Sequence, residues 1–182
     1  GMVFQKSNPF PTMSIAENFA LAARRGRRRG LGWALHRKFR EELRERARGL
    51  HMGLEDRLDN AIGSLSGGQR QALTLLMATW LRPDLLLLDE HTAALDPKSA
   101  EQVLQLTEQV VSKEKLTTLM VTHSMAQAVA HGDRVVMMHQ GQAVYDYAGE
   151  EKKRLLAEEV LACFDELRHR DARDEAAAAK RR

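Results

Sequence analysis

A run of four leucines that ends directly in two acids limits what this chain can fold into. Leu85–Leu88 are followed by Asp89 and Glu90. An unbroken apolar run of this length, preceded by Pro83, is typical of a strand buried on both faces of a parallel sheet. In open sheets of this kind, ligands bind beyond the carboxyl ends of the strands. The sequence therefore predicts an α/β core with a pair of carboxylates at its ligand-binding edge.

The residues that follow alternate between helix and strand patterns, which favours this α/β core. Asp96 before Pro97 predicts a helix start, and that helix should run to about residue 112. The stretch 116–122 is apolar and β-branched, so we expect a second buried strand that ends at His123. The remaining predicted elements are a short helix from Ser124 to Gly132, strands at 134–139 and 142–147, and a helical segment from Gly149, with 173–182 frayed or disordered.

The first 82 residues are predicted to be mainly helical. We expect a strand end and loop at 1–5, helices at 14–23, 33–50 and 69–81, a basic loop at 24–32 and a mixed polar segment at 54–64. The chain is accordingly divided into four parts. These are a loop region at 1–13, a helical subdomain at 14–82, the rest of the α/β core at 83–148, and a C-terminal helix with a basic tail at 149–182.

Composition excludes several classes of protein. The single Cys163 excludes an intramolecular disulfide framework and any C-x-x-C metal pair. The run at Leu85–Leu88 is far too short to span a bilayer. If the protein works at a membrane, we therefore expect a partner to hold it there.

Positive charge is concentrated in one segment. Residues 24–48 hold 11 Lys or Arg against three Glu, whereas the net charge of the whole chain is +3. Such a block is compatible with a solvated helix face, a surface for anionic lipids or a nucleic-acid patch. The sequence leaves these three interpretations open.

A second motif, Ser66-Gly67-Gly68-Gln69, has the chemistry of an anion site. The glycines remove side chains where the backbone must approach a ligand closely. The helix that follows presents free N–H groups and the positive end of its dipole, and the Ser66 hydroxyl adds a donor. We therefore expect this segment to suit a terminal phosphate.

The residues after the two predicted strands have complementary chemistry. Asp89 can hold Mg²⁺, directly or through water, and Glu90 can orient and polarise an attacking water. His123, at the end of the next strand, can hydrogen-bond a terminal phosphate. Asp96 is an adequate helix N-cap in its own right, and this role is compatible with one in the site.

Taken in order, these motifs resemble the nucleotide-binding domain of an ABC transporter ATPase, over Gly1 to about Asp146. The segments that carry the resemblance are Val3-Phe4-Gln5 for the Q-loop, Leu65–Gln69 for the family signature, Leu85–Glu90 for Walker B with the catalytic glutamate, Ala94-Leu95-Asp96 for the D-loop and His123 for the H-loop. Ser14–Asn18 is similar to the helix start that follows the Q-loop in importer subunits.

The resemblance implies a partial P-loop NTPase (RecA-like) core of mainly parallel strands with an α-helical signature subdomain. In the family, two such domains sandwich two ATP molecules with Mg²⁺. By this resemblance Gln5, Asp89, Glu90 and His123 act on the ATP of their own protomer, with Gln5 and Asp89 toward Mg²⁺. The signature residues Leu65, Ser66, Gly67, Gly68 and Gln69 would face the ATP of the partner, and Asp96 belongs to the nucleotide site.

The sequence departs from the family pattern at one point. None of its glycines is followed by Lys, so the phosphate-cradling motif G-x-x-x-x-G-K-[ST] does not occur in it. A sheet without the strands that accompany that motif is expected to expose apolar surface and strand edges. We therefore expect residues 1–182 alone to bind ATP poorly, and to aggregate or to pair with another chain.

The function that the resemblance implies is that of an ATP-binding and hydrolysing subunit of an ABC transporter, more an importer than an exporter. Its expected partners are a second nucleotide-binding domain, a transmembrane permease and a solute-binding protein, without nucleic acid. Its expected place is cytoplasmic, on the inner face of the membrane. Two alternatives stay open: a soluble ABC-type ATPase acting on nucleic acid or ribosomes, and a truncated, non-catalytic remnant. Local likenesses to phosphate and to amino-acid uptake systems disagree about the solute.

Overall fold

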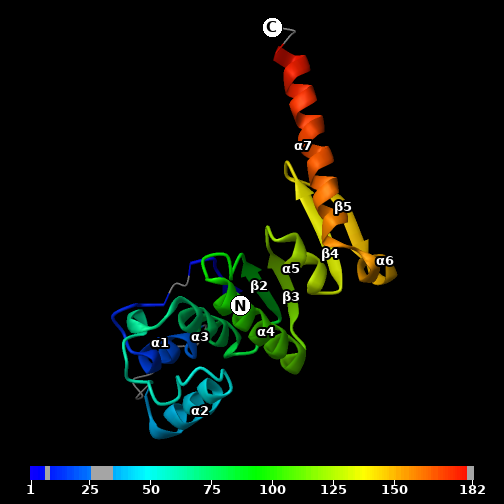
Figure 1. The fold of residues 1–182 in the computed structure, drawn as a ribbon. Helices are drawn as coiled ribbons and strands as arrows, with labels where there is room; N and C mark the ends of the chain where they lie inside the picture. Colours follow the sequence, from blue (N-terminus) through cyan, green and yellow to red (C-terminus); the bar gives the residue numbers. More distant parts are fainter. Residues whose placement is uncertain (7–8, 26–34, 180–182) are drawn as a thin grey trace. The chain divides into compact units, whose positions relative to one another are not determined.

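The computed structural model describes residues 1–6, 9–25 and 35–179, with side chains to residue 172 (Figure 1). The chain forms two compact units, Gly1–Val121 and Thr122–Arg182. Most of the predicted basic loop at 24–32 and the start of the predicted helix at 33 lie outside the described residues. The four-part division made from the sequence stays a prediction.

In its described residues, the first unit combines a three-stranded parallel sheet with four α-helices. Its strands lie in the order β1 (Met2–Val3), β2 (Leu85–Asp89) and β3 (Thr117–Val121). The helices are α1 (Ile15–Ala22), α2 (Arg37–Arg48), α3 (Gly67–Thr79) and α4 (Pro97–Glu114). The parallel pairing confirms the α/β core expected from the sequence.

The described residues of the first unit cover only one face of this sheet, which corrects the prediction that both strands are buried on both faces. Val3, Leu86 and Leu88 are almost fully buried and belong to one core with residues of α3 and α4. On the opposite face, Leu85, Leu119 and Val121 are 44%, 59% and 50% exposed. Within the described residues of the first unit nothing covers this second face, so the unit by itself shows the expected exposure of apolar sheet surface. The expected aggregation or pairing stays a prediction.

The helix starts follow from side-chain caps. Ser14 and Ser66 each form a capping box, with Glu17 and Gln69 respectively, and Asp96 caps α4 with Pro97 in the first turn. The third helix therefore begins at Gly67 and not at residue 69 as predicted. The second helix runs from Arg37 to Arg48, shorter than the predicted 33–50, because the His36 ring accepts a hydrogen bond from the Phe39 amide and caps it.

An aromatic cluster holds the helices of the first unit together. Trp80 lies edge-on to Phe19, with ring centroids 5.4 Å apart, and its centroid is 5.5 Å from that of Phe39. The Arg46 guanidinium lies 4.1 Å above the Trp80 ring and donates to the Trp80 carbonyl. This cluster joins α1 and α2 to the end of α3.

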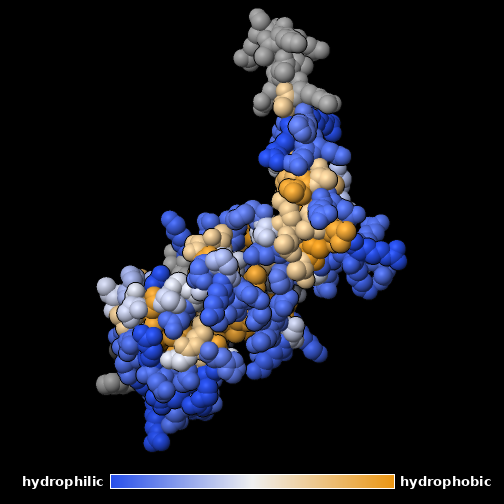
Figure 2. All heavy atoms as spheres, viewed as in Figure 1, coloured by the Kyte–Doolittle hydropathy of each residue, from blue (hydrophilic) through white to orange (hydrophobic). Residues whose placement is uncertain are grey.

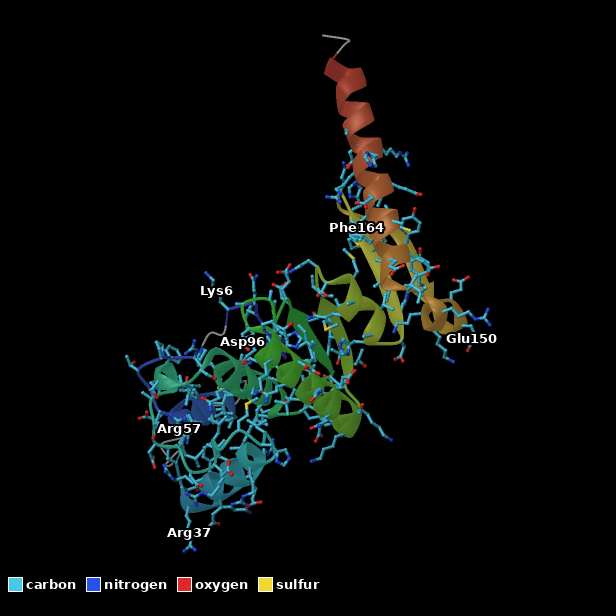
Figure 3. All side chains as sticks on the ribbon, viewed as in Figure 1. Lys6, Arg37, Arg57, Asp96, Glu150 and Phe164 are labelled. Carbon is cyan, nitrogen blue, oxygen red and sulfur yellow. The ribbon has the colours of Figure 1, made fainter. Side chains whose placement is uncertain are left out.

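Ion pairs neutralise much of the described part of the basic block. Arg37, Arg46 and Arg48 pair with glutamates of α2 itself, and Arg40 donates to both carboxylate oxygens of Asp59. The face of α2 that is visible in Figure 2 is mainly hydrophilic, and Arg37 projects from the start of the helix (Figure 3). These contacts favour a solvated helix face over a lipid or nucleic-acid surface for residues 37–48.

The second unit, as far as residue 179, is an antiparallel hairpin with three helices. Its elements are α5 (Met125–Ala130), β4 (Arg134–His139), β5 (Gln142–Ala148), α6 (Gly149–Arg154) and α7 (Ala157–Ala179). Val135, Met137, Leu155 and Val160 form its core, and Phe164 of α7 packs against it (Figure 3). His139 Nε2 lies 2.7 Å from Asp171 Oδ2, which joins the end of β4 to α7.

Two expectations for the C-terminal segment were wrong. The helical pattern from Gly149 is two helices, because Leu155 is extended and the Glu159 carboxylate accepts from the Leu156 amide to start the next helix. Residues 173–179 are helical and not frayed, as the high helix propensity of their alanines explains; residues 180–182 lie outside the described part. No helix among the described residues has both the length and the apolar character needed to cross a membrane.

Candidate functional site

The structure brings Gln5 and Glu90 together at the carboxyl edge of the parallel sheet. Val3 pairs with Leu88 in the register of β1 and β2, so the residues two positions further on lie beside each other. The Gln5 amide Nε2 donates to Glu90 Oε2 over 3.1 Å. Two of the predicted site residues, 85 positions apart in the chain, are thereby joined.

The backbone of Glu90 is held in an uncommon conformation. Its φ is 43°, in the left-handed region that residues other than glycine rarely occupy. Its amide donates to the Val121 carbonyl at 2.9 Å, and its own carbonyl accepts from the Ala93 amide at 3.0 Å. A turn of this kind right after a strand re-aims the side chain, and rare conformations cluster at functional sites.

The donors at this edge fit a magnesium ion held mainly by a nucleotide. Asp89 ends β2 and is partly exposed. Because Gln5 uses its side-chain Nε2 to donate to Glu90, the Oε1 of the same side-chain amide can serve as a further oxygen ligand. Mg²⁺ in nucleotide sites is bound through one or two protein oxygens plus phosphates and water. Among the described residues no group of three or more His, Cys, Asp or Glu could hold a metal ion by itself.

The signature residues form the N-terminus of α3. The Ser66 hydroxyl accepts from the Gln69 amide at 3.2 Å, and Gln69 Oε1 accepts from the Ser66 amide at 3.1 Å. Because the hydroxyl oxygen serves as the cap, its proton is the part of Ser66 suited to donate to an anion. Leu65, by contrast, is 4% exposed and part of the core, so its place in the signature is explained by packing.

The two glycines of the signature have a structural reason that the sequence did not suggest. A Cβ on Gly68 would lie 3.0 Å from Ser99 Cβ, and one on Gly67 would lie 3.1 Å from Leu95 Cδ2. The glycines therefore let α3 approach the segment that contains Asp96. Close approach to a ligand, the reason assigned to them from the sequence, stays a prediction.

Asp96 acts as the N-cap of α4, as predicted. Its carboxylate accepts from the Ser99 amide at 3.0 Å. Hydrogen bonds from the side chain and the backbone of Ser99 lower the pKa of Asp96, which keeps it ionised. Whether it also serves the nucleotide site stays a prediction.

His123 belongs to the second unit, where its neighbours fix its backbone. The Thr122 hydroxyl donates to Gln127 Oε1 at 2.9 Å and accepts from the Ser124 amide at 3.1 Å. Ser124 in turn caps α5. A role for His123 beside Glu90 stays a prediction that comes from the resemblance.

Sequence reasoning missed Gln71, which positions the segment around Gln5. Its side chain is 2% exposed, and its amide Nε2 donates to the Phe4 carbonyl at 3.2 Å. A buried amide on the apolar face of a helix needs hydrogen-bond partners. The signal in the sequence was the polar Gln71 directly before Ala72, which lies on the predicted apolar face.

Replacing Gln71 with leucine is expected to lower the free energy of unfolding by about 1–2 kcal/mol, because the Phe4 carbonyl loses a donor. Amide hydrogen exchange at residues 4–6 should accelerate more than in α4. The matched control is Gln102→Leu on the exposed side of α4, expected within about 0.5 kcal/mol of the parent. Equal effects of the two variants would contradict this role for Gln71.

Comparison with known proteins agrees with this geometry. The family model for the ABC transporter matches residues 1–93. A tyrosine transport ATP-binding protein of Clostridioides difficile is 43% identical over 155 residues, which cover 85% of this chain and 61% of that protein. The phosphate import ATP-binding protein PstB of Corynebacterium efficiens is 42% identical over 136 residues, covering 74% of this chain and 50% of the relative.

PstB of Aeropyrum pernix is 38% identical over 147 residues, which cover 79% of this chain and 56% of the relative. The chain thus spans between half and about three fifths of the length of these three relatives. The matched region includes Gln5, the signature at the start of α3, and the acids that end β2. By this match and by its parallel sheet, the chain belongs to the ABC transporter family.

Proposed function

We propose that this chain is the catalytic part of an ATP-hydrolysing subunit of an ABC importer. The observation that carries the proposal is the contact between Gln5 and Glu90 at the carboxyl edge of β1 and β2. It places an amide and a carboxylate where ligands of parallel sheets bind. Two of the relatives are named for tyrosine transport and for phosphate import, which supports an importer.

In the proposed reaction Glu90 is the base. Its carboxylate orients and polarises the water that attacks the terminal phosphate of ATP, and Gln5 holds that carboxylate through its amide. Asp89 and the Gln5 carbonyl oxygen would hold Mg²⁺, which when bound neutralises charge on the phosphates. Ser66 and the amides at the start of α3 would contact the ATP of a second nucleotide-binding domain.

The test is Mg-ATP hydrolysis by residues 1–182, alone and with an added fragment that carries a G-x-x-x-x-G-K-[ST] loop. Hydrolysis in either mixture that is lost in Glu90→Gln supports the proposal. Hydrolysis that survives in this variant places the chemistry elsewhere. No nucleotide binding and no hydrolysis in both mixtures favours the non-catalytic remnant.

We further propose that the segment around Phe10 contacts a transmembrane permease, which would hold the subunit at the cytoplasmic face of the membrane. Phe10 is 59% exposed, yet its backbone is tightly fixed. The buried Asn18 side chain accepts from the Phe10 amide at 2.8 Å and donates to the Phe10 carbonyl at 3.1 Å. An exposed aromatic ring on a rigid segment is a suitable anchor for a partner.

Replacing Phe10 with alanine is expected to lower solute uptake by at least about tenfold, a loss typical of one anchor residue. Basal ATP hydrolysis should stay within about twofold, since the ring is outside the core. Uptake of tyrosine and of phosphate would be measured in proteoliposomes that hold the assembled transporter, with Leu21→Ala as the control for an exposed apolar residue. Unchanged uptake of whichever solute the parent transports would contradict this contact.

A further inference from the structure

The residue after Glu90 is a buried histidine to which the proposed reaction assigns no step. His91 is 2% exposed, and its Nε2 lies 3.1 Å from the Oγ1 of Thr107, which is 6% exposed in the third turn of α4. The Thr107 hydroxyl itself donates to the Val103 carbonyl at 2.8 Å. Because a hydroxyl has one proton, His91 Nε2 is the donor to Thr107 and carries a hydrogen.

This bond fastens the turn that holds Glu90. The turn begins at Glu90, whose φ is 43°, and ends at Asp96, the cap of α4. The backbone of Glu90 makes two hydrogen bonds: its amide donates to the Val121 carbonyl, and its carbonyl accepts from the Ala93 amide. The side chain of His91 adds a connection from the next residue into the middle of α4. A rare backbone conformation persists only where its surroundings determine it.

We propose that His91 is a positioning residue for Glu90. Its hydrogen bond to Thr107 keeps Glu90 in the left-handed conformation in which the carboxylate accepts from the Gln5 amide. The inference rests on the proposed function, because Glu90 is the base there. In this proposal the effect of His91 on hydrolysis passes through Glu90, so His91 is assigned a positioning role and no chemical step.

Two variants remove the bond from opposite sides, and two variants serve as their controls. Thr107→Val removes the acceptor and keeps the shape of the side chain, and His91→Leu removes the donor. Thr79→Val is the matched control: Thr79 is 7% exposed in α3, and its hydroxyl donates to the Leu75 carbonyl four residues earlier at 2.9 Å. His91→Gln keeps an N–H donor and is the conservative rescue.

The first measurement is amide hydrogen exchange of residues 1–182. In Thr107→Val and His91→Leu, the amides of Glu90 and Ala93 should exchange about tenfold faster relative to those of β2, as the loss of one buried hydrogen bond permits. In Thr79→Val and His91→Gln this ratio should stay within about twofold of the parent. An equal rise at Glu90, Ala93 and β2 would show that the bond only stabilises the fold, and would overturn the proposal.

The second measurement is steady-state ATP hydrolysis, with the loop-bearing fragment present if the parent needs it. Thr107→Val should lower kcat about tenfold at unchanged KM, the size of effect typical of a residue that orients a catalytic group. A kcat equal to that of Thr79→Val would overturn the proposal. If Glu90→Gln leaves hydrolysis unchanged, the proposed function fails, whereas the exchange ratio still decides whether His91 holds the conformation of Glu90.

Discussion

Hydrolysis of ATP is expected to fall by at least about 100-fold when Glu90 is replaced with glutamine, with ATP binding retained. Glutamine keeps the size of the side chain and an oxygen that can accept from the Gln5 amide. It removes the negative charge that polarises water, and general-base catalysis of this kind contributes about 10²–10⁴-fold. The measurement is kcat and ATP affinity in the mixture in which the parent hydrolyses ATP.

The matched control for this prediction is Glu101→Gln, the same change at an exposed position of α4. Its kcat is expected within about twofold of the parent, because surface changes away from a site have little effect. If Glu90→Gln keeps a third or more of the parent kcat, Glu90 is not the base. If the variant also loses ATP binding, the site has collapsed, and the free energy of unfolding of the variant should then be lower than that of the parent.

The free energy of unfolding is expected to fall by about 3–5 kcal/mol when Phe19 is replaced with alanine. Phe19 is fully buried, and its ring meets that of Trp80 edge-on at the junction of α1 and α3. Among the described residues Phe19 is the largest side chain that is fully buried, and its truncation leaves a cavity, because the surrounding structure relaxes only partially. The measurement is urea unfolding followed by tryptophan fluorescence in a Trp33→Phe background, in which Trp80 of this cluster is the remaining tryptophan.

Phe10→Ala is the matched control, since the same change at a ring that is 59% exposed should cost less than about 1 kcal/mol. A loss of 3–5 kcal/mol is a large part of the stability of an ordinary domain. Phe19→Leu, expected to cost about 1–2 kcal/mol as a partial truncation, therefore keeps the prediction measurable if the alanine variant does not fold. Equal costs for Phe19→Ala and Phe10→Ala would contradict the assigned core.

Local signals in the sequence predicted several elements closely. Asp96 with Pro97 marked the start of α4, and Ser14 marked the start of α1, because N-caps are satisfied by atoms within one turn of the chain. Element ends were less accurate. The break at Leu155 was not predicted, although the Glu159 carboxylate that caps the next helix lies within one turn of it, and the Leu155 side chain packs in the core of the second unit.

The candidate site was predicted only as a set of residue types. The acids after the leucine run and the glycines of the signature could be named from the sequence, because their chemistry is fixed by residue type and their order by the chain. Gln71 and His91 could not be assigned roles, because a buried polar side chain acts through partners that are distant in sequence. Gln71 reaches back to Phe4, and His91 reaches forward to Thr107.

The sequence by itself thus predicted the α/β class and the helix starts at Ser14 and Asp96, the latter two because a cap and its partners lie within one turn of the chain. The groups that it names for a phosphate site stay a prediction. Only the tertiary structure decided which face of the sheet is covered, that Gly68 packs closely against Ser99, and that Gln5 meets Glu90. These features depend on strand register and helix packing, which are set by the summed contacts of the whole unit rather than by any local pattern.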